Sequence, residues 1–145
     1  MMNTFRIAAI VGLFGWTSLV ALSAYSAAPG AQAAAQTGAG TSQQERGKAA
    51  YVDKCSECHQ ENLKGNNDTP PLSGDMFWGN WETYNANNLL EQMRTTMPED
   101  NPGSLDRQTY VDILAYILKF NEVPMTGDLP SDADSLKKIV IKRKE

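Results

Sequence analysis

Two cysteines and the only histidine of this 145-residue chain stand together in one short stretch. Read in order, the stretch is Cys55-Ser56-Glu57-Cys58-His59. Two thiols at this spacing lie one helical turn apart, so they can add across the two vinyl groups on one edge of a haem. The histidine that follows is then held over one haem face, where its imidazole can ligate the iron. The pattern therefore predicts one haem c bound covalently to Cys55 and Cys58, with His59 as an axial iron ligand.

Three other kinds of site use closely spaced cysteines, and each fits this sequence less well. A structural zinc site takes four Cys or His ligands, whereas the chain has two cysteines and one histidine. A thioredoxin-like C-x-x-C motif lies near a βαβ pattern, and no strand-like alternation precedes Cys55. A disulfide between Cys55 and Cys58 would close a very small loop and leave His59 without a role. Haem attachment accounts for all three residues.

The second axial ligand cannot be histidine, because the sequence contains only one. The remaining choices are methionine, lysine, asparagine, an amine, water or an open position. Four methionines follow His59, namely Met76, Met93, Met97 and Met125. Met97 is favoured because it leaves a predicted helix into a proline-bounded loop, with enough chain after His59 to cross a haem. Met125 is the second choice. Met93 lies on the apolar face of a predicted helix and is expected in the core. Met76 is close in sequence to His59, which occupies the other side of the haem.

The elements that must position these residues are helices. Ser42 and Glu45 form a capping box, which predicts a helix that runs through Val52 into the haem motif. Gly47 weakens this helix, and its presence indicates a close approach by a second helix, with Tyr51 packed beside the crossing. The haem motif is therefore expected at the end of a helix that contacts another helix.

The segment after the haem motif is predicted to be a loop. Its glycine, proline and asparagine residues break regular structure over residues 62–74, and a carbonyl there can accept the Nδ1 proton of His59. A helix follows over residues 88–96, with Asn87 as its N-cap. Between the loop and this helix stand candidates for the haem wall or the core, which are Met76, Phe77, Trp78 and Trp81.

The strongest helical pattern covers residues 105–120, with Ser104 as the predicted N-cap. Its apolar residues recur at helical spacing and form a broad face that suits contact with both a haem and another helix. Ala115 and Tyr116 are the candidates to meet the helix that carries Gly47.

Four segments are expected along the chain. Residues 1–33 have a positive start, an apolar run and a small-x-small cleavage site, which predicts an export signal that is either cleaved or retained as an anchor. Residues 34–42 are expected to be a flexible linker and residues 43–121 the haem domain. Residues 122–145 are expected to form a tail that is partly wrapped on the domain. Either fate of the signal places the domain outside the cytoplasm.

The formal net charge of −4 is unevenly distributed. Residues 45–134 carry sixteen acidic and seven basic side chains, whereas five basic residues follow within 137–144. No basic run adjoins the predicted haem domain, so nucleic-acid binding is not expected. A membrane is expected as a partner only if residues 1–33 are not cleaved.

Six motifs stand out along the chain, namely Gly47-x-x-x-Tyr51, Cys55-x-x-Cys58-His59, Pro70-Pro71-Leu72-x-Gly74, Arg94-Thr95-Thr96-Met97-Pro98, Pro102-Gly103-Ser104-Leu105 and Leu114-Ala115-Tyr116-Ile117-Leu118. Together these motifs make the sequence resemble the class I cytochromes c. The resemblance covers residues 43–121 and implies an all-α fold with about three to five helices around one covalently bound haem. It also implies Met97 as the distal iron ligand.

Two of these motifs, Pro70-Pro71-Leu72 and the run from Arg94 to Pro98, are narrower. They are similar to small cytochromes, and fused cytochrome domains, that accept electrons from pyrroloquinoline-quinone (PQQ) alcohol dehydrogenases. The resemblance implies a periplasmic electron carrier rather than an enzyme, because His59 and Met97 fill both axial positions. Its expected partners are redox proteins, with a periplasmic dehydrogenase as donor and a cytochrome or oxidase as acceptor. The alternative is a haem enzyme or a sensor of gas or peroxide, in which Met97 is labile.

Overall fold

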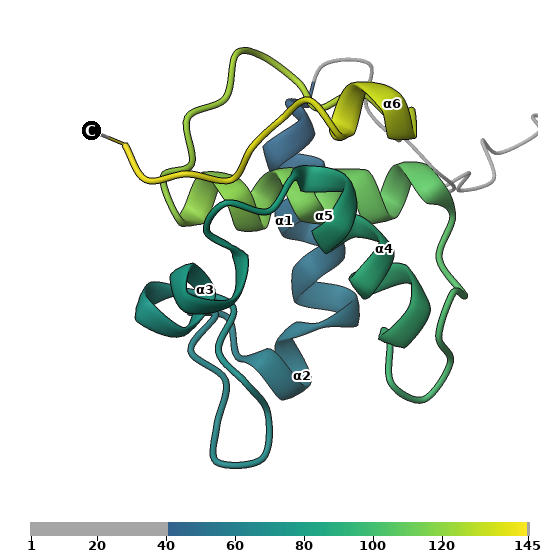
Figure 1. Ribbon diagram of the computed structural model, residues 1–145. Coiled ribbons are helices and arrows are strands. Elements are labelled where there is room, and N and C mark those ends of the chain that lie inside the picture. Colours follow the sequence, from purple (N-terminus) through teal and green to yellow (C-terminus); the bar gives the residue numbers. More distant parts are fainter. Residues whose placement is uncertain (1–40, 145) are drawn as a thin grey trace, which may run out of the picture. The chain divides into compact units, whose positions relative to one another are not determined.

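The computed structural model describes residues 41–144, which form an all-helical domain (Figure 1). The only β-pairing in this range is a single bridge between Asn85 and Val140, so the predicted all-α class is confirmed. The export signal predicted over residues 1–33, and the predicted linker up to residue 40, lie outside the described residues. None of the helices within the described range is long and apolar enough to span a membrane. The helices are α1 Gln43–Lys54, α2 Ser56–His59, α3 Gly74–Trp81, α4 Ala86–Thr96, α5 Arg107–Phe120 and α6 Ala133–Leu136.

The helices α1 and α5 cross in close contact. At the crossing lies Gly47, where a Cβ atom would stand 1.8 Å from the carbonyl oxygen of Asp112. One turn along α1, the fully buried ring of Tyr51 packs against the ring of Tyr116, with 5.3 Å between the centroids. The predicted close approach at Gly47 is confirmed. The nearest atoms to this Cβ position belong to Asp112 and to Tyr116, and Tyr116 is one of the two residues predicted to meet this helix.

Replacing Gly47 by alanine is expected to lower the free energy of unfolding by about 3 kcal/mol, at the upper end of the range for overpacking. The added methyl group meets a backbone carbonyl, which can move away only if the two helices separate. Gly79→Ala in α3 is the matched control, because nothing lies within 4 Å of a Cβ atom there. Chemical denaturation of the haem-loaded protein, followed by circular dichroism, compares the two variants. Equal stability of both would show that the crossing tolerates a side chain.

The N-caps of α4 and α5 each lie two residues from the predicted N-cap. The N-cap of α4 is Asn85 instead of Asn87, because the side chains of Asn85 and Asn88 accept each other's backbone N–H at 3.0 and 3.2 Å. The N-cap of α5 is Asp106 instead of Ser104, and its carboxylate accepts the backbone N–H three residues on at 3.0 Å. In both cases the cap is the residue whose side chain reaches the free N–H groups of the first turn.

The helix α3 was not expected from the sequence. Its eight residues include two glycines and an asparagine, which weaken the helical signal. Tertiary contacts compensate, because Phe77 is buried in the core and the Asn121 side chain accepts the N–H of Gly74 at 3.3 Å. Phe77 and Trp81 are four residues apart, so α3 presents both on one face.

The tail after α5 packs against the rest of the domain at several places. The side-chain amide of Gln43 accepts the N–H of Leu129 at 2.6 Å and donates to the Leu129 carbonyl at 3.0 Å. Further along, the N–H of Ile141 donates to the Tyr84 carbonyl at 2.8 Å. Leu136 and Ile141 are fully buried. The tail therefore contributes side chains to the hydrophobic core as well as covering it.

Candidate functional site

A largely apolar pocket is lined by residues of helices α2, α3, α4 and α5. All four site residues predicted from the sequence contribute to its wall, although a long stretch of chain separates His59 from Met97. The residues that line the pocket are Lys54, Cys55, Cys58, His59, Pro70, Pro71, Leu72, Phe77, Asn80, Trp81, Leu89, Gln92, Met93, Thr96, Met97, Glu99, Ile113 and Ile117.

His59 is held in the form that binds a metal. Its side chain is buried, and Nδ1 lies 3.0 Å from the carbonyl oxygen of Pro70. A carbonyl can only accept a hydrogen bond, so Nδ1 carries the proton and Nε2 keeps its lone pair. Burial also lowers the pKa of His59, which favours the neutral ring. The acceptor expected in the 62–74 loop is therefore the Pro70 carbonyl.

The two cysteines reach the pocket from the junction of α1 and α2, and both thiols are free. The N–H of His59 donates to the Cys55 carbonyl at 2.9 Å, so one helical turn joins the cysteines to the histidine. Cys58 is exposed and Cys55 is partly buried. Burial raises the pKa of the Cys55 thiol to about 11, so this thiol is a poor nucleophile once the chain has folded.

Met97 stands at the carboxyl end of α4. Its N–H donates to the Met93 carbonyl at 2.8 Å, and its own carbonyl accepts the hydroxyl of Tyr110 at 2.7 Å. Met93 lines the same pocket. Met76 is more than half exposed, and Met125 lines a separate hollow beside the tail. The runner-up ligand Met125 is thus not brought to the pocket, whereas Met97 is.

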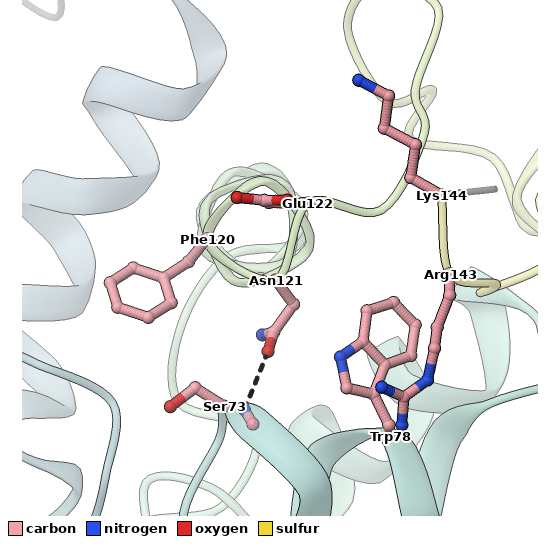
Figure 2. A pocket seen from close by; sticks show the side chains of 8 residues that line it. Ser73, Trp78, Phe120, Asn121, Glu122, Arg143 and Lys144 are labelled. Carbon is pink, nitrogen blue, oxygen red and sulfur yellow. Dashed lines mark hydrogen bonds between the residues drawn. The ribbon is translucent and has the colours of Figure 1, made fainter.

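The wall of the pocket contains only two of the four large apolar residues that follow the loop. Phe77 and Trp81 line it, but Met76 and Trp78 do not. Trp78 faces a second pocket, in which the guanidinium of Arg143 lies 5.0 Å from the centre of its ring (Figure 2). Trp78 is therefore part of the packing between α3 and the tail, and Trp81 is the tryptophan of the candidate site.

The chemistry of the pocket fits a covalently attached haem. Apolar side chains form most of the wall, as a flat aromatic macrocycle requires. Two free thiols lie in one part of this wall, and the wall also offers a neutral imidazole and a thioether sulfur. Imidazole and thioether are the axial ligand types of an electron-carrying haem iron. Structural zinc needs four protein ligands around one point, and no group of three or more Cys, His, Asp or Glu side chains among the described residues could hold a metal ion directly.

Acidic side chains occur in the lining of the pocket and next to its cysteines in the sequence. Glu57, between the two cysteines, is exposed, and Glu99 lines the pocket. The one cation in the lining, Lys54, forms an ion pair with Asp53 at 2.8 Å. We call Asp53, Glu57 and Glu99 the acidic rim. Because Lys54 offsets a single one of these charges, the rim is net negative.

Two tyrosine hydroxyls that the sequence analysis did not identify hold the segments next to the iron-ligand candidates. Tyr51 donates to the carbonyl of Gln60 at 2.8 Å, and Tyr110 donates to the carbonyl of Met97 at 2.7 Å. The position of Tyr110 could have been predicted from its spacing to Ile113. It precedes Ile113 by three residues, so it lies on the helix face that lines the pocket.

Comparison with known proteins gives one family. The family model described as cytochrome C oxidase, cbb3-type, subunit III matches residues 42–117, slightly more than half of the 145-residue chain. Every residue that lines the pocket falls within the matched range. Neither the curated proteins nor the solved structures compared with the chain give a significant match.

Proposed function

The chain belongs to the family of cytochrome c domains that this model describes, and from this premise we propose a single-haem electron carrier with His59 and Met97 as the axial iron ligands. Membership of the family implies covalently bound haem c and electron transfer. When bound, haem c supplies one-electron chemistry, because its iron can be ferrous or ferric. The observation that carries the proposal is the single pocket in which both thiols, His59 and Met97 meet.

Each residue of the pocket has a separate task in this proposal. Cys55 and Cys58 hold the haem edge through thioether bonds. The Pro70 carbonyl keeps the Nδ1 proton of His59 in place, so that Nε2 faces the iron. Met97 would supply the second iron ligand when haem is bound, which would leave no place for a substrate. The apolar wall excludes water, which limits the reorganisation of solvent when the charge of the site changes.

A potentiometric titration followed by visible absorption tests the proposed function. One haem that carries one electron predicts a single reversible transition with a one-electron slope. A protein that shows no reversible transition, or two resolved transitions, would not be a single-haem carrier.

We propose a periplasmic quinoprotein dehydrogenase as the electron donor, and a cytochrome or oxidase as the acceptor. The support for the donor is the resemblance of the motifs Pro70-Pro71-Leu72 and Arg94 to Pro98 to cytochromes that serve PQQ alcohol dehydrogenases. Stopped-flow mixing with a substrate-reduced PQQ alcohol dehydrogenase tests this. A cognate pair is expected to react at about 10⁵ M⁻¹ s⁻¹ or faster, and a much slower reaction would point to another donor class.

The acidic rim is expected to make association with the donor depend on salt. Cys58, which holds one haem edge in this proposal, is exposed and adjoins Glu57 in the sequence, so a partner with a basic docking surface would be attracted there. Raising the ionic strength shortens the Debye length from about 10 Å at 0.1 M to about 3 Å at 1 M. The second-order rate of reduction should therefore fall steeply with salt, and Glu57→Gln should weaken this dependence.

Lys142→Gln is the matched control for that measurement, because Lys142 is an exposed residue of the basic tail. A point substitution is preferable to truncation of the tail, which would remove the buried Ile141. The salt dependence of Lys142→Gln should equal that of the unaltered protein. If Lys142→Gln removes the dependence and Glu57→Gln does not, the tail attracts the partner instead of the acidic rim.

We also propose that the domain is exported and works in the periplasm, with residues 1–33 as its signal. The support is the small-x-small site that ends at Ala33 and the extracytoplasmic location typical of cytochrome c domains. Mass spectrometry of the mature protein distinguishes a cleaved signal from a retained anchor. Accumulation of the haem-loaded protein in the cytoplasm would contradict export.

A further inference from the structure

Tyr110 holds the backbone of the residue that presents its sulfur to the pocket. Its hydroxyl donates to the Met97 carbonyl at 2.7 Å, and its side chain is only 2 % exposed. We propose that Tyr110 is a positioning residue that keeps Met97 on the iron, and thereby keeps small gaseous ligands off it. This inference rests on the proposed ligation of the iron by Met97.

The helix α5 fixes the place of the Tyr110 hydroxyl. Tyr110 lies in the first turn of α5, where its N–H donates to the carbonyl of the N-cap Asp106 at 3.2 Å. Ile113 and Ile117 follow at spacings of three and seven residues, and both line the pocket. The element that forms one wall of the pocket therefore also anchors the Met97 segment through a single hydrogen bond.

Little else holds the Met97 carbonyl. Among residues 41–144, the only other donor to it is the N–H of Gly103, at a longer 3.4 Å. The next residue is Pro98, which has no N–H and cannot tie the chain back to α4. Loss of the Tyr110 hydroxyl would leave a half-buried carbonyl with one weak bond. The segment that carries Met97 would then be freer to move away from the pocket.

Loss of the Tyr110 hydroxyl would shift the equilibrium between iron-bound and released Met97 towards release. A gas can bind the ferrous iron only when Met97 has left it, so the apparent affinity is set by the fraction of molecules in which Met97 is released. Removal of one intramolecular hydrogen bond shifts such an equilibrium by about two- to tenfold. Tyr110 would thus contribute to the difference between a pure electron carrier and a haem protein that binds gases.

Tyr51 provides a matched control. It is also a buried tyrosine, and its hydroxyl donates to a backbone carbonyl at almost the same distance, 2.8 Å to Gln60. Gln60 follows His59, so this bond stabilises the proximal side of the pocket. Tyr51→Phe and Tyr110→Phe each remove one hydroxyl from a buried ring, and both should lower the free energy of unfolding by similar amounts. Only Tyr110→Phe should alter the release of Met97.

The test uses the haem-loaded protein with Tyr110→Phe, Tyr51→Phe or no substitution. Carbon monoxide is mixed with each reduced protein, and the rate and extent of complex formation are followed by visible absorption. We expect Tyr110→Phe to increase both by about two- to tenfold, and Tyr51→Phe to change neither. An equal increase in both variants would mean general loosening of the fold and would overturn the inference. No change in Tyr110→Phe would overturn it as well.

Met97→Ala, measured in parallel, separates this inference from the proposed function. If Met97→Ala leaves the far-red charge-transfer band of the oxidised protein unchanged, Met97 is not the ligand and the proposed ligation fails. If Met97→Ala removes the band while Tyr110→Phe behaves like the unaltered protein, the ligation stands and only the role of Tyr110 is lost.

Discussion

Replacement of Cys58 by alanine is expected to abolish attachment of the haem through two thioethers and to reduce the yield of folded protein sharply. The exposed Cys58 thiol lines the pocket, where it would secure one edge of the haem. Without a stable haem, the apolar side chains of the pocket, such as Phe77 and Ile113, face an unfilled space. A denaturing gel stained for haem peroxidase activity, with mass spectrometry of the same band, measures the loss.

Ser56→Ala is the control for this experiment, because Ser56 lies in the same turn and its hydroxyl bonds only to the Val52 carbonyl. It should keep its covalent haem. Cys58→Ala cannot form two thioether bonds, because it has only one cysteine. The result that would contradict covalent attachment must therefore come from the unaltered protein. If its haem is released in denaturant, covalent attachment at Cys55 and Cys58 is wrong.

Replacement of Met97 by alanine is expected to remove the weak sulfur-to-iron charge-transfer band of the oxidised protein. The reduction potential should fall by an amount on the order of 100 mV, because axial ligands tune haem potentials over a wide range and a thioether favours the reduced iron. Absorption spectroscopy and a potentiometric titration measure the two effects. The expected changes follow from the place of Met97 in the wall of the pocket that His59 also lines.

Two further methionines serve as controls for the Met97 variant. Met93→Leu keeps the volume of a neighbouring residue that also lines the pocket, and Met125→Leu changes the runner-up from the sequence. Both should keep the charge-transfer band. A band that survives in Met97→Ala but disappears in Met93→Leu or Met125→Leu would assign the distal ligand to the other methionine.

The sequence was most informative where chemistry or sterics allow few alternatives. Thioether attachment requires two cysteines at a fixed spacing and an adjacent histidine, so Cys55, Cys58 and His59 could be identified without a structure. The close contact at Gly47 was also predictable, because a glycine inside a good helical pattern costs stability unless another helix approaches it. Its partner was less predictable, since residues on the face of α5 are candidates at several neighbouring positions.

The sequence was least informative where tertiary contacts override local preference. The helix α3 contains Gly79 and Asn80, yet burial of Phe77 stabilises it. The N-caps of α4 and α5 were each displaced by two residues, because several capping residues follow one another at both places. Hydrogen bonds from a side chain to a distant carbonyl, such as that from Tyr110 to Met97, depend on how the helices and loops pack. The spacing of residues along the sequence therefore predicts them poorly.

Carbon monoxide added to the reduced, unaltered protein tests most directly whether residues of the chain fill both axial positions of the iron. Ligation by His59 and Met97 predicts that the visible spectrum does not change on mixing, and that any later conversion is slow and limited by release of Met97. An immediate and complete change to the carbon monoxide spectrum would show an open iron position. That result would contradict the electron carrier and favour a haem enzyme or a gas sensor.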